Sequence, residues 1–169
     1  MSGDKQYGGT VMAAAGKYLT FQLNSQEYGL EILKVQEIIG IMSVTRVPRT
    51  PAHIRGVINL RGKVIPVIDL RLKFAMEPQA DTERTCIIVV QLRRGGQVMT
   101  IGIIVDEVSE VTNLTEDQLA PPPEFGTRVD TDFILGMGRV GTKVLTLLDI
   151  DKALTTEDVR AVDASAQAA

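Results

Sequence analysis

Short apolar runs separated by turn residues follow one another along this chain, and their spacing constrains the fold more than any other feature. In "YLTFQL", Leu19, Phe21 and Leu23 alternate with other residues, as in a half-buried strand. "RRGGQ" lies between two such runs and has the glycines of a hairpin turn. Roughly ten runs of this kind, with almost no helical pattern between them, predict a mainly β fold of antiparallel barrels rather than a doubly wound sheet.

The polar stretch "AMEPQADTE" is the best candidate for a boundary inside the fold. We therefore expect two small barrels that divide near residues 75–84, with strand exchange between them allowed. Residues 1–16 are small, polar and rich in Gly and Ala, so we expect a loose tail there. "TTED" predicts a short C-terminal helix from about Thr156, and residues 160–169 are expected to fray.

Cys86 is the only cysteine of the 169 residues, so an intrachain disulfide is excluded. It lies in "TCIIVV", where a buried structural cysteine is expected. The N-terminus lacks the apolar region of a secretory signal, and no apolar stretch approaches the roughly 20 residues of a membrane span. We expect a cytoplasmic protein that does not insert into a membrane.

The charges are unevenly distributed along the chain. Residues 46–73 hold seven Lys and Arg and one acid, Asp69, whereas residues 106–132 hold eight acids and one base, Arg128. Two solvated faces of opposite sign explain this as well as a basic face that meets an acidic protein surface. Nucleic acid is a less suitable partner, because the basic segment lacks interleaved aromatic residues for base stacking.

The stretch "GVINLRGKVIPVIDLR", residues 56–71, contains two glycines followed by a lysine but does not fit a phosphate-binding loop. Five residues separate Gly56 from Gly62 where such a loop has four, and Lys63 precedes Val64 instead of a hydroxyl residue. The residues that follow indicate a strand, not the helix that a phosphate loop needs. A nucleotide site is therefore excluded.

Other motifs of catalysis or ligand binding also fail in their context. "GMGRVG" at residues 136–141 matches a dinucleotide fingerprint, but a strand pattern follows it and a hairpin turn fits better. His53 has no recognisable partner, which leaves a zinc site without support. Asp106, Glu107 and Glu110 fit the charged end of a strand better than an acid pair of a hydrolase. We expect no enzyme activity, no cofactor and no metal.

The remaining interpretation of residues 56–71 is a strand, a tight turn and a second strand. Gly62 permits the turn, and Arg61 beside it projects from it, either into solvent or toward a carboxylate or carbonyl groups of a partner. Pro66 cannot donate a hydrogen bond to a sheet, so its strand is expected at an edge or with a bulge.

Several segments of the chain together resemble the CheW family of bacterial chemotaxis coupling proteins. They run in order over residues 17–159 and include "EYGLEILKVQEI", "VTRVPRTPAHIRGVINLRGKVIPVIDLRLKF", "GIIVDEVSEV", "LTEDQLAPPPEF" and "LLDIDKAL". The "GVINLRG…PVIDLR" block is specific to this domain type, which also forms the regulatory end of the CheA histidine kinase. Because the chain has no kinase or receiver domain, it resembles the free-standing adaptor.

This resemblance implies two five-stranded SH3-like barrels that share a hydrophobic core. It implies a non-catalytic adaptor that couples the CheA kinase, through its regulatory domain, to the cytoplasmic tips of chemoreceptors in arrays beneath the inner membrane. Contacts with further CheW copies in rings are implied as well. A related scaffold in a two-component pathway outside chemotaxis is the alternative.

The resemblance also assigns roles to individual residues. Arg61 matches the arginine that faces the receptor tip, and Val35 and Glu37 match positions on the same groove. Asn59 and Gly62 belong to the motif that shapes this groove. For the kinase contact we expect apolar strand edges of the first barrel, at Leu19 and Ile32, although packing in the core explains both residues equally well.

Overall fold

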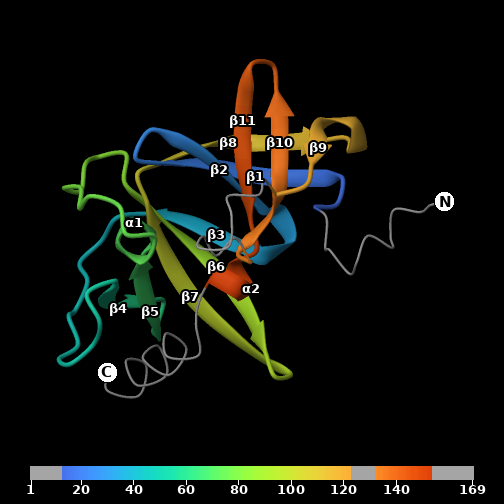
Figure 1. Cartoon of the computed structure of the whole chain (residues 1–169). Helices are drawn as coiled ribbons and strands as arrows, with labels where there is room; N and C mark the ends of the chain where they lie inside the picture. Colours follow the sequence, from blue (N-terminus) through green and yellow to red (C-terminus); the bar gives the residue numbers. More distant parts are fainter. Residues whose placement is uncertain (1–12, 123–131, 154–169) are drawn as a thin grey trace.

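The computed structural model describes residues 13–122 and 132–153, and it contains two β-sheets with very little helix. Figure 1 shows one sheet above the other. The elements in chain order are β1 (Gly16–Leu23), β2 (Gln26–Glu31), η2 (Ile32–Lys34), β3 (Val35–Gly40), β4 (Ile54–Leu60), β5 (Lys63–Asp69), α1 (Leu70–Lys73), β6 (Cys86–Arg94), β7 (Gln97–Val105), β8 (Glu107–Leu114), η3 (Glu116–Gln118), β9 (Leu119–Ala120), β10 (Ile134–Val140), β11 (Lys143–Leu148) and α2 (Ile150–Ala153).

The two sheets confirm the predicted mainly β fold but not the predicted strand counts. One sheet has six strands in the order β8-β1-β2-β11-β10-β9, and the other has five in the order β3-β6-β7-β5-β4. The sixth strand of the larger sheet is the two-residue β9. Turn signals therefore located most strands correctly, while so short a strand leaves no pattern in the sequence.

The segment after β3 closes the five-stranded sheet on itself. Thr45 forms an isolated bridge with Val57 of β4, and two backbone hydrogen bonds of 2.8 Å join them. Gly56 makes this approach possible, because a Cβ atom at its position would lie 2.1 Å from the carbonyl oxygen of Thr45. The first glycine of the "GVINLRG" motif thus serves barrel closure.

A core shared by both sheets lies between them. Phe21 and Leu23 of β1 pack in one buried cluster with Ile88 and Val90 of β6. Ile87 and Val89 of β6 point instead into a second cluster, inside the five-stranded barrel. Both faces of β6 are therefore buried, which explains why this part of the sequence is continuously apolar and does not alternate.

The expected boundary at residues 75–84 does not divide the two sheets. This segment connects α1 to β6, and the strands on either side of it, β5 and β6, belong to the same five-stranded sheet. The six-stranded sheet combines β1 and β2 with β8 to β11, so its strands come from both ends of the described chain. A polar stretch indicates an exposed connection, but it does not indicate which sheets are connected.

The two termini fall largely outside the described residues. Of the expected tail at residues 1–16, the described part is packed: Ala13 is buried and Gly16 begins β1. The helix expected from about Thr156 and the frayed residues 160–169 lie outside the described residues. The last described helix is α2, which begins earlier, at Ile150.

Pro66 lies on an interior strand, so the prediction of an edge strand was wrong. β5 is placed between β4 and β7, but its parallel pairing with β7 starts only at Val67. Pro66 therefore precedes the ladder with β7 that its missing N–H would interrupt. The bulge lies on the partner strand β4, between Ile54 and Gly56.

No helix within residues 13–122 and 132–153 is long and apolar enough to cross a membrane.

Candidate interaction site at the turn between β4 and β5

Arg61 and Gly62 form a two-residue turn between β4 and β5. The register pairs Leu60 with Lys63, so only these two residues lie outside the ladder. Their φ angles are 53° and 87°, the positive values of a turn whose twist matches that of the flanking strands. Glycine adopts such a conformation without steric cost, whereas an arginine does not. An arginine in the left-handed region suggests a functional reason for its presence.

Asn59 fixes the shape of this turn. Its side-chain oxygen accepts a hydrogen bond of 2.8 Å from the backbone N–H of Gly62. Asparagine commonly stabilises turns in this way. Asn59 and Gly62 therefore hold the backbone that presents Arg61.

The guanidinium of Arg61 pairs with the carboxylate of Glu37 on β3. The Arg61 side chain is nevertheless 66% exposed, and that of Glu37 is 26% exposed. The hydrogen bond to Glu37, together with its negative charge, raises the pKa of Arg61 above its ordinary value. Two sequence-predicted residues thus meet in space, although β3 and β4 are the two outer strands of their sheet.

Val35 has a different environment from Glu37. It is half-buried and packs against the shared core. The register of β3 against β6 shifts between Val35 and Glu37, so an extra residue, Gln36, separates them. Such a bulge re-aims the side chains on either side of it. Val35 therefore lies beside the core while Glu37 holds Arg61.

The proposed kinase contact at Leu19 was wrong. Leu19 is 1% exposed and belongs to the shared core, so its side chain is unavailable to a partner. The alternation in "YLTFQL" was correctly identified, but its apolar face is the buried one. Ile32 in η2 is half-buried against the same core. The next residue, Leu33, is 93% exposed and was missed, because nothing in "EILKV" distinguishes an exposed leucine from a buried one.

A second arginine of the same motif, Arg71 at the start of α1, is buried. Its side chain is 1% exposed and pairs with Asp69 at 3.1 Å and with Asp106 at 3.0 Å. Asp69 also accepts a hydrogen bond from the backbone N–H of Arg71 and so caps α1. Asp106 lies between β7 and β8, where the chain passes from one sheet to the other. Arg71 therefore ties the two sheets together.

Burial alone would lower the pKa of Arg71, because it disfavours the charged form. The hydrogen bond and charge of Asp69, with the charges of Asp106 and Asp81, outweigh this effect and raise the pKa above its ordinary value. The group remains a cation inside the protein. A buried cation of this kind needs its carboxylates, so the cluster acts as a unit.

Arg55 and Asp81 extend this cluster to the connecting segment. Arg55 is the extra residue of the bulge in β4 and pairs with Asp81 at 2.8 Å. Arg55 and Arg71 were both counted in the basic segment that was thought to face solvent or a partner. The structure instead engages them with acids of the same chain, so the exposed basic surface is smaller than the sequence indicates.

The acids considered for catalysis are not arranged for it. Asp106 is bound by Arg71 and by the backbone N–H of Asn24, and Glu107 lies 3.8 Å from Arg84. Within the described part of the chain, no group of three or more His, Cys, Asp or Glu residues could hold a metal ion. "GMGRVG" spans the end of β10 and the turn to β11, which confirms the hairpin interpretation.

Comparisons with known proteins agree with this architecture. Residues 17–158 match the family described as the CheW-like domain. A protein of Klebsiella aerogenes named chemotaxis protein CheW is 45% identical over 159 residues, which cover 91% of this chain and 93% of that protein. A probable chemotaxis protein CheW of Rhizobium etli is 35% identical, over 79% of this chain and 83% of that protein.

A solved structure shares the fold. The crystal structure of the scaffolding protein TtCheW from Thermoanaerobacter tengcongensis matches with a TM-score of 0.73 and 37% sequence identity. The match covers 82% of this chain and 92% of that chain.

Proposed function

The chain belongs to the CheW family, and from this membership we propose that it couples the CheA histidine kinase to the cytoplasmic tips of chemoreceptors. Members of this family are non-catalytic chemotaxis scaffolds. The proposed work is mechanical: one stiff body holds a receptor and a kinase at once, so that a change in the first alters the second. The protein would then reside in receptor arrays beneath the inner membrane, with its own copies as further neighbours in rings.

We assign the receptor contact to the Arg61 turn. The supporting observation is that Arg61 occupies a left-handed conformation and remains 66% exposed while Glu37 holds its guanidinium. A group that is ordered before binding loses less conformational entropy when a partner arrives. The fork of an arginine can bond carboxylates or backbone carbonyls of the receptor helices, and Val35 would contribute apolar contact at the margin of the core.

We assign the kinase contact to η2, at Ile32 and Leu33. A leucine that is 93% exposed forfeits the free energy of burial, roughly 2 kcal/mol, unless a partner covers it. η2 precedes β3, which carries Glu37, so the two contacts lie at opposite ends of one short strand. This arrangement would let one rigid element connect both partners.

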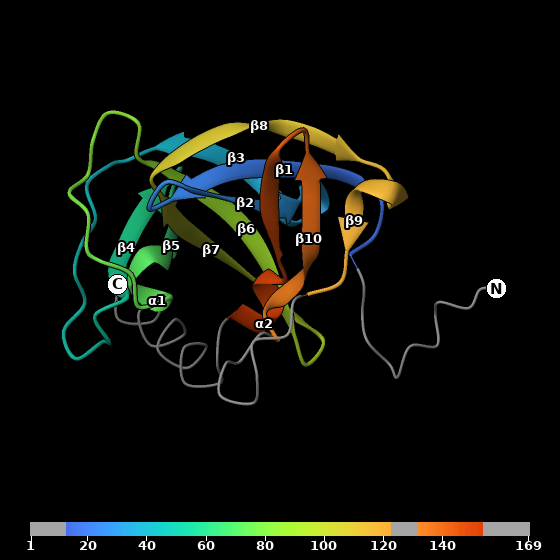
Figure 2. The same cartoon turned by 45° about the horizontal axis from the view of Figure 1, so that its top comes forward.

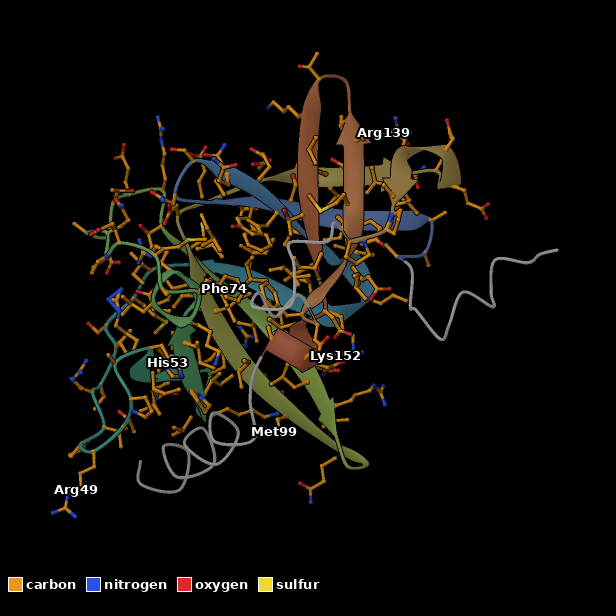
Figure 3. All side chains as sticks on the ribbon, in the orientation of Figure 1. Arg49, His53, Phe74, Met99, Arg139 and Lys152 are labelled. Atoms are coloured by element: carbon orange, nitrogen blue, oxygen red, sulfur yellow. The ribbon has the colours of Figure 1, made fainter. Side chains whose placement is uncertain are left out.

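The test of the receptor contact is Arg61→Glu, with Arg49→Glu as the matched control. Arg49 is also an exposed arginine at positive φ, and Figure 3 shows it projecting away from the body of the molecule. In pull-downs with receptor and with CheA, Arg61→Glu should weaken receptor binding at least about tenfold and leave kinase binding unchanged. Equal loss in both variants would show a general charge effect and refute the assignment.

The test of the kinase contact is Leu33→Ser, compared with Val98→Ser. Val98 is an exposed apolar residue, 51% exposed, near the β6–β7 turn. Leu33→Ser should weaken binding to CheA and reduce receptor-stimulated kinase phosphorylation, whereas Val98→Ser should not. Normal kinase binding by Leu33→Ser would exclude η2 as the contact.

A further inference from the structure

The strand β8 has a free edge. It is an outer strand of the six-stranded sheet and pairs only with β1. Figure 2 shows it along the upper rim of the molecule. The backbone N–H and carbonyl of Glu110 both bond the Thr20 hydroxyl on β1, at 3.2 and 2.9 Å. Because neighbouring residues of a strand direct these groups to opposite sides, those of Val111 point outward.

The other outer strands of the described chain are less available. β9 has only two residues, β4 is bridged by Thr45, and Arg61 reaches across to β3 through Glu37. β8 has eight residues without proline or lysine, the residues that most often prevent edge pairing. Val111 on this strand is 51% exposed. β8 is therefore the edge that is best able to accept another strand.

An open pocket of about 430 Å³ lies beside this edge. Ser109 and Thr112 of β8 line one side of it, and residues 140–143, the turn between β10 and β11, line the other. Ser109 is the residue that the register of β8 against β1 skips, so a bulge turns the strand at this point. The pocket offers room for a side chain of a strand that pairs with β8.

The charges around the pocket select the occupant. Glu27 and Glu110 line it with a single base, Lys143, and residues 106–119 contain five acids and no Lys or Arg. Antiparallel pairing of two β8 strands would bring Glu107 and Glu110 of one copy close to those of the other, which is unfavourable. A strand with basic side chains would be attracted instead.

We infer that β8 binds an extended segment of a partner protein with basic side chains, which adds to the sheet as a seventh strand. Main-chain hydrogen bonds to β8 supply affinity, and one basic side chain enters the pocket beside Glu110. This inference does not rest on the proposed coupling role, because β8 belongs to the sheet that does not contain Arg61.

The experiment titrates the full chain, labelled with ¹⁵N, with two synthetic peptides that alternate Val or Thr with Lys in one and with Glu in the other. The Lys peptide should shift the amide signals of β8 and of the β10–β11 turn, and the Glu peptide should bind at least about tenfold more weakly. Glu110→Lys should weaken the Lys peptide about fivefold or more. Glu83→Lys, which reverses an exposed acid of the connecting segment, should not.

Val111→Pro removes the outward N–H while the Glu110 bonds to β1 remain. It should abolish binding of the Lys peptide, with thermal unfolding and the spectrum of the remaining amides as a check that the protein is folded. Equal binding of both peptides, signal changes away from β8, or no binding at millimolar peptide would overturn the inference. So would sedimentation showing a dimer that Val111→Pro dissolves, because the edge would then belong to a second copy.

Discussion

Two five-residue segments of this chain are almost the same, yet their arginines have opposite fates. Residues 58–62 read "INLRG" and residues 68–72 read "IDLRL". Arg61 is 66% exposed and pairs with one carboxylate, while Arg71 is 1% exposed and lies among three. The strand β5 separates them.

The residue after each arginine accounts for the difference. Gly62 adopts a φ of 87°, so the first chain reverses into a hairpin, and Asn59 bonds its N–H. Leu72 cannot do this cheaply, so the second chain enters the helix α1, which Asp69 caps. A turn leaves its arginine at the surface, whereas a helix start beneath the junction of the sheets buries it. One arginine is therefore available to partners, and the other is part of the structure.

The largest effect should come from Arg71→Ala. It leaves Asp69, which is 5% exposed, and Asp106 without their cation, and removing one partner of a buried ion pair costs about 3–5 kcal/mol. Urea unfolding followed by circular dichroism would measure the loss. Arg71→Lys retains the charge but not the planar fork, so its loss should be smaller. A loss below about 1 kcal/mol for Arg71→Ala would make the two arginines equivalent in stability and refute the comparison.

A smaller effect is expected from Gly62→Ala. No atom lies within 4 Å of the position of the added Cβ, so the cost arises only from the positive φ. We expect a loss of about 1–2 kcal/mol in the free energy of unfolding. Ala at exposed Gly40, whose φ is not positive, is the control and should cost little. An equal cost at both glycines would mean that the turn geometry does not matter.

These differences show what the sequence does and does not reveal. Local signals were sufficient for the strands and for the hairpin at Gly95 and Gly96, because a two-residue turn is encoded by its own residues. The assignment of strands to sheets was not predictable. It depends on two parallel pairings between distant segments, β2 with β11 and β5 with β7, for which strand spacing contains no signal.

The functional residues divide in the same way. The "NLRG" motif located the exposed turn and its arginine. The burial of Arg71 was missed because its carboxylate partner Asp106 comes 35 residues later, and the burial of Leu19 was missed because an alternating pattern defines two faces without saying which is inward. Asn59 and Gly62 could be assigned because their interaction is local.

Alkaline pH separates the arginines from the other buried ionisable groups. Burial raises the pKa of Tyr28, and burial with the nearby charge of Glu31 raises that of Tyr18. Above pH 10 the unfolded chain loses these protons before the folded one, so stability falls as the pH rises. Both arginines keep their charge there, since the pKa of each is raised.

Urea unfolding of the wild type and of Tyr28→Phe between pH 8 and pH 11 measures this effect. Phe preserves the ring that stacks between Phe21 and Phe74, with centroid distances of 6.0 and 6.5 Å. The variant should lose less stability than the wild type across this range. An identical fall in the two proteins would mean that Tyr28 does not ionise with unfolding.

The smallest effect has the opposite sign and concerns Arg61 itself. Asn is the residue best suited to the first position of this turn, so Arg61→Asn should relieve the left-handed strain at φ 53°. The exposed pair with Glu37 is lost, but such pairs contribute little to stability. We therefore expect the melting temperature to rise by about 1–3 °C while receptor binding weakens. A protein that retains a strained arginine where asparagine is more stable does so for binding, and a fall in melting temperature would show instead that Arg61, like Arg71, serves the fold.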